Sequence, residues 1–388
     1  MSVDTTGSRQ ASRDSRGMGL LGWRLVATAR DVFARLGLLE WVQRLQNLGT
    51  DRRRAQRANK LVPEILARLA ASVDHAASAS WRLNRVVPTV SDVLVVKAGP
   101  ADQPSEALIK IAETPAAAKG LKWQVEALTT LSADQRLGDW RELLPQVLHT
   151  GEADACAYVI ETRVSGVNLE QALHDPVSAD AALRDAAEAI GHLHRATTEV
   201  LAVDGAHLDR WVREPVRLLT SATNRADKHR PTAPALERLS LELCGVLETQ
   251  KLALSWVHGD YTPGNILMAP DGHISGIVDW EFAQPSDFPS LDIVMLLLTV
   301  RMYARRQELG RVVCDLVTSP DWSDVENDLV TAAPDAATWE SVGVSRIVLL
   351  CWLRHTAWMI ERWGRYATSG LWLHTNVHMV LDALQDDA

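Results

Sequence analysis

The chain has 388 residues, of which 47% are hydrophobic and 23% are charged, a composition typical of a large globular protein with ample material for buried cores. Its length predicts two or three domains rather than one simple core. The formal net charge of −9 argues against a nucleic-acid-binding protein, because such proteins usually present a net basic face.

The cysteines and the apolar segments indicate in which cellular compartment the protein is expected. The four cysteines are far apart and form no Cys-x-x-Cys pair, so we expect free thiols in a reducing compartment and no zinc site. No apolar run reaches the roughly 18 residues of a membrane span, and the N-terminus lacks the features of a signal peptide. These features predict a cytoplasmic protein.

Residues 1–80 are predicted to form an N-terminal extension. Residues 1–17 are polar and basic, residues 19–47 have the apolar spacing of one or two amphipathic helices, and another helix is predicted over residues 61–73. We favour helices that pack on the body of the protein, with the arginines at positions 52–54 in solvent. The other interpretation is an arm at residues 19–47 that contacts a membrane surface or a partner.

Residues 81–160 are predicted to form a small lobe rich in β-strands. Two β-type runs, residues 93–98 and 107–112, are joined by a polar turn that contains proline and glycine. Lys110 lies inside the second run, where its charge requires a partner unless the side chain points to water from an edge strand. A helix that carries Glu126 is predicted over residues 121–131.

A helical domain is predicted over residues 161–388, after a further β-type run at residues 157–163. Its first long helix spans residues 179–200 and carries His194, which we interpret as a hydrogen-bonded structural histidine. The C-terminal third is rich in tryptophan at near-helical spacing, a pattern more typical of a core than of a ligand site.

The segment from His258 to Leu267, followed by residues 277–281, contains the pattern with the clearest chemistry. Asp260 and Asn265 lie five positions apart on a short loop, and a predicted hairpin brings the chain back at Asp279. Phosphoryl transfer needs one carboxylate to orient and deprotonate an alcohol, and an Asn and a second carboxylate to hold Mg²⁺ against nucleotide phosphates. The sequence therefore predicts a phosphotransferase site.

This pattern resembles the aminoglycoside phosphotransferase and choline kinase family, which has a protein-kinase-like fold. The resemblance rests on His258-Gly259-Asp260 with Asn265, and on Val278-Asp279-Trp280-Glu281. It implies that Asp260 is the catalytic base, that Asn265 and Asp279 bind Mg²⁺, and that His258 and Asp292 give structural support. The implied fold is α+β, with a β-rich N-lobe, a helical C-lobe and an N-terminal helical extension.

The resemblance also implies a nucleotide site in the N-lobe. Lys110 is then expected to contact the α- and β-phosphates and to form an ion pair with Glu126. The Glu161 carbonyl and the Arg163 amide are expected to face the edge of adenine, with Ile160 beside the base. These assignments imply ATP, or alternatively GTP, as the nucleotide.

The loop expected to cover the phosphates departs from the family pattern. Such loops are usually rich in glycine, whereas residues 86–93 contain none, and this leaves Ser91 and backbone amides as candidate phosphate contacts. A catalytically silent, kinase-like protein that binds a ligand or docks a partner is therefore the alternative function. The presence of Asp260, Asn265 and Asp279 opposes that alternative.

We therefore expect ATP-dependent transfer of the γ-phosphoryl group to a hydroxyl of a small molecule. The acceptor classes are an aminoglycoside or other antibiotic, an amino-alcohol and a sugar. In the resembled family the acceptor binds between the catalytic loop and the C-terminal helices, so the C-terminal third would determine specificity.

Overall fold

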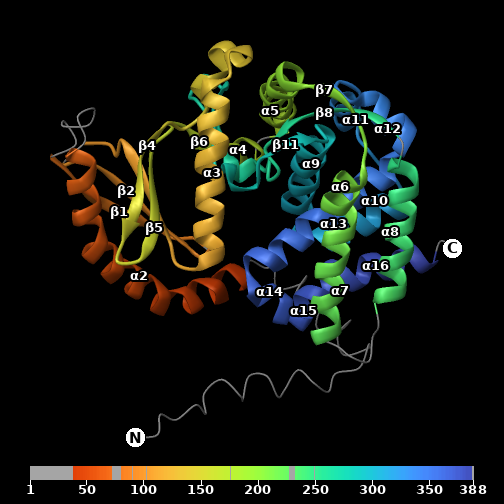
Figure 1. Ribbon diagram of the computed structural model, residues 1–388, viewed down its shortest axis with the longest axis horizontal. Helices are drawn as coiled ribbons and strands as arrows, with labels where there is room; N and C mark the ends of the chain where they lie inside the picture. The colour runs from red at the N-terminus through yellow and green to blue at the C-terminus, as the bar shows by residue number, and fades with distance from the viewer. Residues whose placement is uncertain are drawn as a thin grey trace, which may run out of the picture.

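The computed structural model describes residues 38–71, 80–89, 91–101, 103–174, 176–226, 232–248 and 250–386. A β-rich lobe and a larger helical lobe lie side by side, at the left and right of Figure 1. The predicted α+β architecture with two lobes is confirmed.

The N-lobe is built on a five-stranded antiparallel sheet with the strand order β1-β2-β3-β5-β4. The strands are β1 (Trp81–Val87), β2 (Val93–Pro100), β3 (Ala107–Ala112), β4 (Val147–Ala153) and β5 (Cys156–Thr162). Because side chains alternate along a strand, the β-branched residues of β2, β3 and β5 are divided between two faces. Both faces are covered, which explains why these strands are apolar almost throughout.

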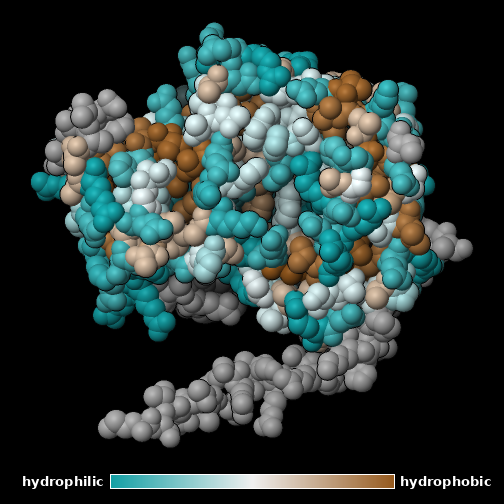
Figure 2. Space-filling view, in the orientation of Figure 1, coloured by the Kyte–Doolittle hydropathy of each residue, from teal (hydrophilic) through white to brown (hydrophobic). Residues whose placement is uncertain are grey.

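Helix α2 (Leu38–Ala70) covers the outer face of the sheet and follows its curve in Figure 1. Its buried stripe packs against β2, β3 and β5 and consists of Ala58, Leu61, Val62, Ile65, Leu66 and Leu69. Burial of each large side chain contributes about 1.5–3 kcal/mol, so this helix is part of the N-lobe core. Its solvent side is hydrophilic, as the left edge of the molecule in Figure 2 shows.

The expectation of packed helices at residues 19–47 lies largely outside the described residues. For residues 38–51 the structure describes the backbone alone, which is helical. The helix predicted over residues 61–73 corresponds to the second half of α2, which ends at Ala70.

Helix α3 (Pro115–Ala133) covers the inner face of the sheet. Thr114 begins the helix by accepting a hydrogen bond from Ala117 N at 3.2 Å, with proline at the first helical position. Its buried stripe contains Leu121, Gln124 and Leu128 at helical spacing. The irregular segment η2 (Gln135–Leu143) then leads to β4.

The C-lobe combines two small sheets with helices around one large apolar core. One sheet contains β6 (Val167–Asn168), β9 (Ile266–Met268) and β10 (Ile274–Ile277), and the other contains β7 (Glu199–Ala202), β8 (Lys251–Val257) and β11 (Gln284–Asp287). The longer helices are α5 (Pro176–Thr197), α7 (Glu214–Ala226), α8 (Ala233–Leu247), α9 (Ser290–Arg305), α10 (Leu309–Thr318), α11 (Asp324–Thr331), α13 (Val344–Arg362) and α16 (Met379–Asp386). Shorter helical segments are α4 (Leu169–Ala172), α6 (Gly205–Leu208), η3 (Asp209–Arg213), η4 (Pro263–Asn265), η5 (Trp280–Phe282), α12 (Ala336–Val342), α14 (Gly364–Thr368), α15 (Gly370–Leu373) and η6 (His374–His378).

Helix α13 passes through the C-lobe core, where Trp352 is fully buried and its indole N–H donates to Asn376 O at 2.7 Å. Trp339 and Trp372 are also buried, so most of the tryptophan pattern belongs to the core. In the described part of the chain, no single helix has the length and apolarity needed to cross a membrane. Helices α12 and α13 meet that criterion only when joined, and a bend of 99° separates them.

Candidate active site

The loop that follows β8 is held from below by one buried carboxylate. Asp292, in the first turn of α9, accepts hydrogen bonds from His258 N and Gly259 N, each at 2.8 Å. His194 Nε2 on α5 lies 3.0 Å from the same carboxylate, and all of these side chains are buried. Because an unpaired buried amide is costly, Asp292 determines the path of the backbone into Asp260.

His258 is held in a single neutral tautomer by its two neighbours. Its Nε2 lies 2.9 Å from Val278 O, which can only accept, whereas Asp260 N can only donate and lies 3.2 Å from Nδ1. The proton of the imidazole is therefore on Nε2. In this state the ring joins the catalytic loop to the segment that carries Asp279.

Gly259 has the conformation and the space that only glycine tolerates. Its φ of 80° lies in the left-handed region, and a Cβ at this position would overlap the carbonyl of Phe282. The close approach packs the catalytic loop against the chain just after Asp279. The glycine between His258 and Asp260 is therefore required for steric reasons, because no larger residue fits at this position.

Asp260 and Asn265 are brought together by the turn at η4. Asn265 Nδ2 donates to Asp260 O at 2.9 Å and to Asp260 Oδ2 at 3.0 Å, and the Asn265 carbonyl accepts from Val278 N at 2.9 Å. The Asp260 side chain is 25% exposed, so solvent or a ligand can reach it. Since Asn265 occupies Oδ2, Oδ1 is the oxygen placed to accept a proton.

Asp279 follows β10 and adopts a left-handed backbone conformation, with φ 65° and ψ 59°. Its Oδ1 lies 2.6 Å from Lys110 Nζ, and the Lys110 ammonium holds the pKa of Asp279 below its ordinary value. The side chain is therefore an anion at neutral pH, as a metal ligand must be.

The donor set fits Mg²⁺ bound together with a nucleotide. Mg²⁺ usually takes one or two protein carboxylates and completes its shell with water and phosphate oxygens. Asp279 provides the carboxylate, and Asn265 can add its amide oxygen because its Nδ2 already serves Asp260. Among the described residues no cluster of three or more His, Cys, Asp or Glu side chains could hold a metal by itself.

The predicted ion pair between Lys110 and Glu126 is not formed. Lys110 Nζ lies 3.0 Å from Glu161 Oε1 on the neighbouring strand β5, in addition to its contact with Asp279. Glu126 instead points to solvent, 3.9 Å from Lys122 one helical turn away. The residue of α3 that reaches Lys110 is Gln124, whose Oε1 accepts from Nζ at 3.1 Å.

Two predictions for the strand at residues 157–163 are also corrected. Ile160 points to the outer face of the sheet and packs with the stripe of α2, so it cannot lie beside a base on the inner face. The Arg163 amide donates to Glu106 O at 2.8 Å and is used within the sheet. The Glu161 side chain faces inward and lies beside Lys110, while the expected contact of its carbonyl with adenine stays a prediction.

Ser91, a candidate phosphate contact, lies just before β2. Its carbonyl accepts from Arg54 Nη2 of α2 at 2.5 Å, and Arg54 Nη1 donates to Thr89 O at 2.7 Å. The same guanidinium pairs with Glu113 after β3, 2.7 Å away. The backbone around Ser91 is thus held from the outer face of the N-lobe, by a residue that we had expected in solvent.

On the C-lobe side, α13 contributes residues that the sequence did not single out for the site. His355 Nδ1 lies 4.0 Å from Asp260 Oδ1, and burial lowers the pKa of this histidine although Asp260 opposes the shift. Trp358 stacks on Phe282 with the ring centroids 5.2 Å apart. These side chains flank the exposed face of Asp260 and the segment after Asp279.

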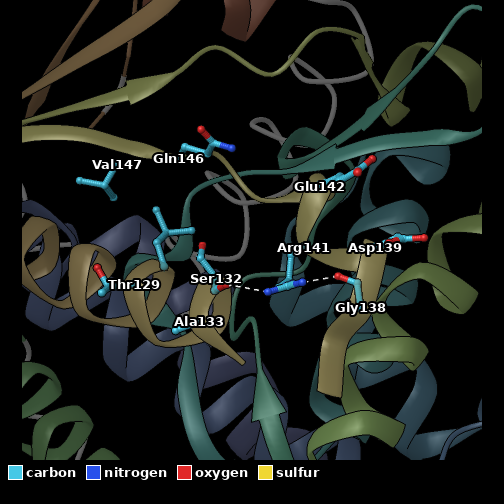
Figure 3. A pocket seen from close by; sticks show the side chains of 10 residues that line it. Thr129, Ser132, Ala133, Gly138, Asp139, Arg141, Glu142, Gln146 and Val147 are labelled. Atoms are coloured by element: carbon cyan, nitrogen blue, oxygen red, sulfur yellow. Dashed lines mark hydrogen bonds between the residues drawn. The ribbon is translucent and has the colours of Figure 1, made fainter. Parts of the chain in front are cut away.

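Two cavities of the described structure lie close to α3. One, of about 460 Å³, is lined by α3, Phe282 and α13, next to the site. The other, of about 610 Å³, lies between the end of α3, η2 and β4. Figure 3 shows Arg141 across it, donating to Ser132 O and Gly138 O. No predicted site residue lines this second cavity.

Comparisons with known proteins identify the family and the fold. The model of the family described as the phosphotransferase enzyme family matches residues 91–322. The solved structure of choline kinase from Cryptosporidium parvum Iowa II is 11% identical, with a TM-score of 0.52, and the match covers 84% of this chain and 95% of that one. Its likeness shows the fold, which confirms the predicted kinase-like architecture.

An aminoglycoside phosphotransferase from Streptomyces rimosus, solved with ADP and streptomycin, also resembles the chain. It is 18% identical, with a TM-score of 0.45, and the match covers 71% of this chain and 92% of that one. The curated proteins contain no match.

Proposed function

The chain belongs to the phosphotransferase enzyme family, whose model covers more than half of its length, and we propose that it transfers the γ-phosphoryl group of ATP to a hydroxyl of a small molecule. The observation that carries this proposal is the convergence of Asp260, Asn265 and Asp279 beside Lys110. Three of these residues come from the C-lobe, and Lys110 comes from the N-lobe sheet. A nucleotide bound between the lobes would meet all four.

Asp260 would orient the acceptor hydroxyl and take its proton at Oδ1. The low pKa of His355 leaves its imidazole uncharged near neutral pH, so it does not neutralise the base. Lys110 would contact nucleotide phosphates, and Asn265 and Asp279 would hold Mg²⁺. When bound, the metal supplies positive charge against the phosphate oxygens.

The acceptor side of the site favours a molecule that carries an amine. The Glu170 carboxylate lies beside Gly264 of the loop that carries Asp260, and burial together with the charges of Glu170 and Asp260 raises the pKa of Tyr303. Two carboxylates therefore lie near one face of the catalytic loop, where a cation would be attracted. We expect an amino-alcohol, an amino sugar or an aminoglycoside to be a better acceptor than its deaminated analogue.

The test is transfer of labelled γ-phosphate from Mg-ATP to paired acceptors with and without an amine. Asp260→Asn should reduce turnover by at least about a hundredfold, because an amide cannot accept the proton, and should leave nucleotide affinity nearly unchanged. Asp279→Ala should instead weaken Mg-ATP binding, measured by calorimetry. Binding of Mg-ATP without transfer to any acceptor would favour the catalytically silent alternative.

A further inference from the structure

The partner of Lys110 is supplied by the sheet rather than by helix α3. Glu161 is fully buried on β5, and Gln124 of α3 is 1% exposed. Gln124 Oε1 accepts from Lys110 Nζ at 3.1 Å, while Gln124 Nε2 donates to Glu161 Oε2 at 2.5 Å. The helix therefore contributes an uncharged amide that connects the ammonium to a strand carboxylate.

Glu161 has two polar neighbours in this buried position, the Lys110 ammonium and the Gln124 amide. Burial raises the pKa of Glu161, and the Lys110 ammonium 3.0 Å away opposes that shift. No other cation is within 4.0 Å of this carboxylate among the described residues. A buried carboxylate without a cation would be strongly unfavourable, so Glu161 and Lys110 depend on each other.

Lys110 has a second carboxylate partner, and the two differ in exposure. The Asp279 side chain is 52% exposed, whereas the Glu161 side chain is fully buried. A ligand that enters between the lobes can therefore compete for Asp279 but cannot reach Glu161. When Asp279 turns to such a ligand, Glu161 is the carboxylate that remains beside the ammonium.

We propose that Glu161 is the positioning residue that holds Lys110 in place for nucleotide phosphates, the role that we had predicted for a glutamate of α3. This inference rests on the proposed function. It makes the strand β5, with Gln124 as a bridge, responsible for the geometry of the phosphate-binding lysine. Movement of α3 would then not break the ion pair, because both charged residues lie on adjacent strands of one sheet.

The experiment compares wild type, Glu161→Gln, the exchange variant Gln124→Glu/Glu161→Gln and the control Glu126→Gln. Binding of Mg-AMP-PNP is measured by calorimetry, and thermal unfolding is measured beside it. Glu161→Gln should weaken binding roughly tenfold, because Lys110 loses a charged partner and pairs with Asp279 alone. The exchange variant again places one carboxylate beside Lys110, now at position 124 of α3. It should therefore restore the affinity for Mg-AMP-PNP to within about threefold of wild type.

Glu126→Gln should bind like wild type, since Glu126 lies on the solvent side of α3. The inference is overturned if Glu161→Gln binds within about twofold of wild type, or if a folded exchange variant binds no better than Glu161→Gln. Should Glu161→Gln fail to fold, the exchange variant decides alone: binding supports the inference and its loss overturns it. A wild type that does not bind Mg-AMP-PNP overturns the proposed function and this role together, whereas a binding wild type with an unaffected Glu161→Gln overturns only the role.

Discussion

Replacement of Asp292 by asparagine should loosen the catalytic loop without touching a reacting group. In the structure Oδ2 accepts from His258 N and His194 Nε2, and Oδ1 accepts from Gly259 N. An asparagine side chain keeps only one oxygen. We expect this oxygen to take the place of Oδ2, where two donors, His258 N and His194 Nε2, need an acceptor. Its NH₂ group then faces the amide of Gly259, so one buried N–H loses its partner and meets a second donor.

The magnitude follows from the bonds that are lost. A hydrogen bond to a charged group contributes about 1.5–3 kcal/mol, and an unsatisfied buried donor costs a further 1–3 kcal/mol. Partial relaxation of the loop reduces this sum, so we expect a loss of about 2–4 kcal/mol in the free energy of unfolding. A displaced Asp260 should also lower kcat by roughly a hundredfold.

Urea unfolding measures the stability, and amide hydrogen exchange at His258 and Gly259 measures the local effect. The matched control is His194→Gln, which retains an N–H donor and both backbone bonds to Asp292, and should lose less than half as much stability. Unchanged protection of the Gly259 amide in Asp292→Asn, with stability within about 0.5 kcal/mol of wild type, would refute the reasoning.

Three further changes probe the lobes separately. Ile65→Ala leaves a cavity between α2 and the sheet and should destabilise the protein by about 2–4 kcal/mol in urea unfolding, whereas a merely appended α2 predicts no loss. Gly259→Ala forces a side chain into a left-handed backbone against Phe282 and should cost about 1–3 kcal/mol and most of the activity; an active, equally stable variant would contradict the close approach. Burial raises the pKa of Cys351 to about 12, so iodoacetamide at pH 8 should leave this thiol unmodified by mass spectrometry until urea unfolds the chain.

The catalytic loop was predictable because its geometry is local. Asp260 and Asn265 lie on one turn, and the hairpin of β9 and β10 returns the chain so that Asp279 follows directly. Short-range turn chemistry determines each of these steps, and the spacing in the sequence reflects it. Asp292 could be placed as well, since it lies in the first turn of the helix that follows.

The partner of Lys110 could not be predicted from spacing alone, because it depends on which faces of two elements meet. Glu126 is two positions from Gln124, and residues two apart on a helix point in different directions. A signal was nevertheless present, since Gln124 is the polar member of the apolar stripe that includes Leu121 and Leu128. The register of β3 against β5 then decides that Glu161 faces the same side as Lys110, and register is a long-range property.

The same reasoning applies to helix α2 and gives it a part in the N-lobe. Arg54 precedes Ala58, Leu61 and Ile65 at helical spacing, so it belongs to the buried stripe of α2 and is 9% exposed. A guanidinium in that position must find acceptors, and it finds them in Glu113 and in the carbonyls of Thr89 and Ser91. A glycine-rich loop would depend on its own backbone freedom. In this chain α2, which shares a hydrophobic core with the sheet, holds the segment before β2 through Arg54.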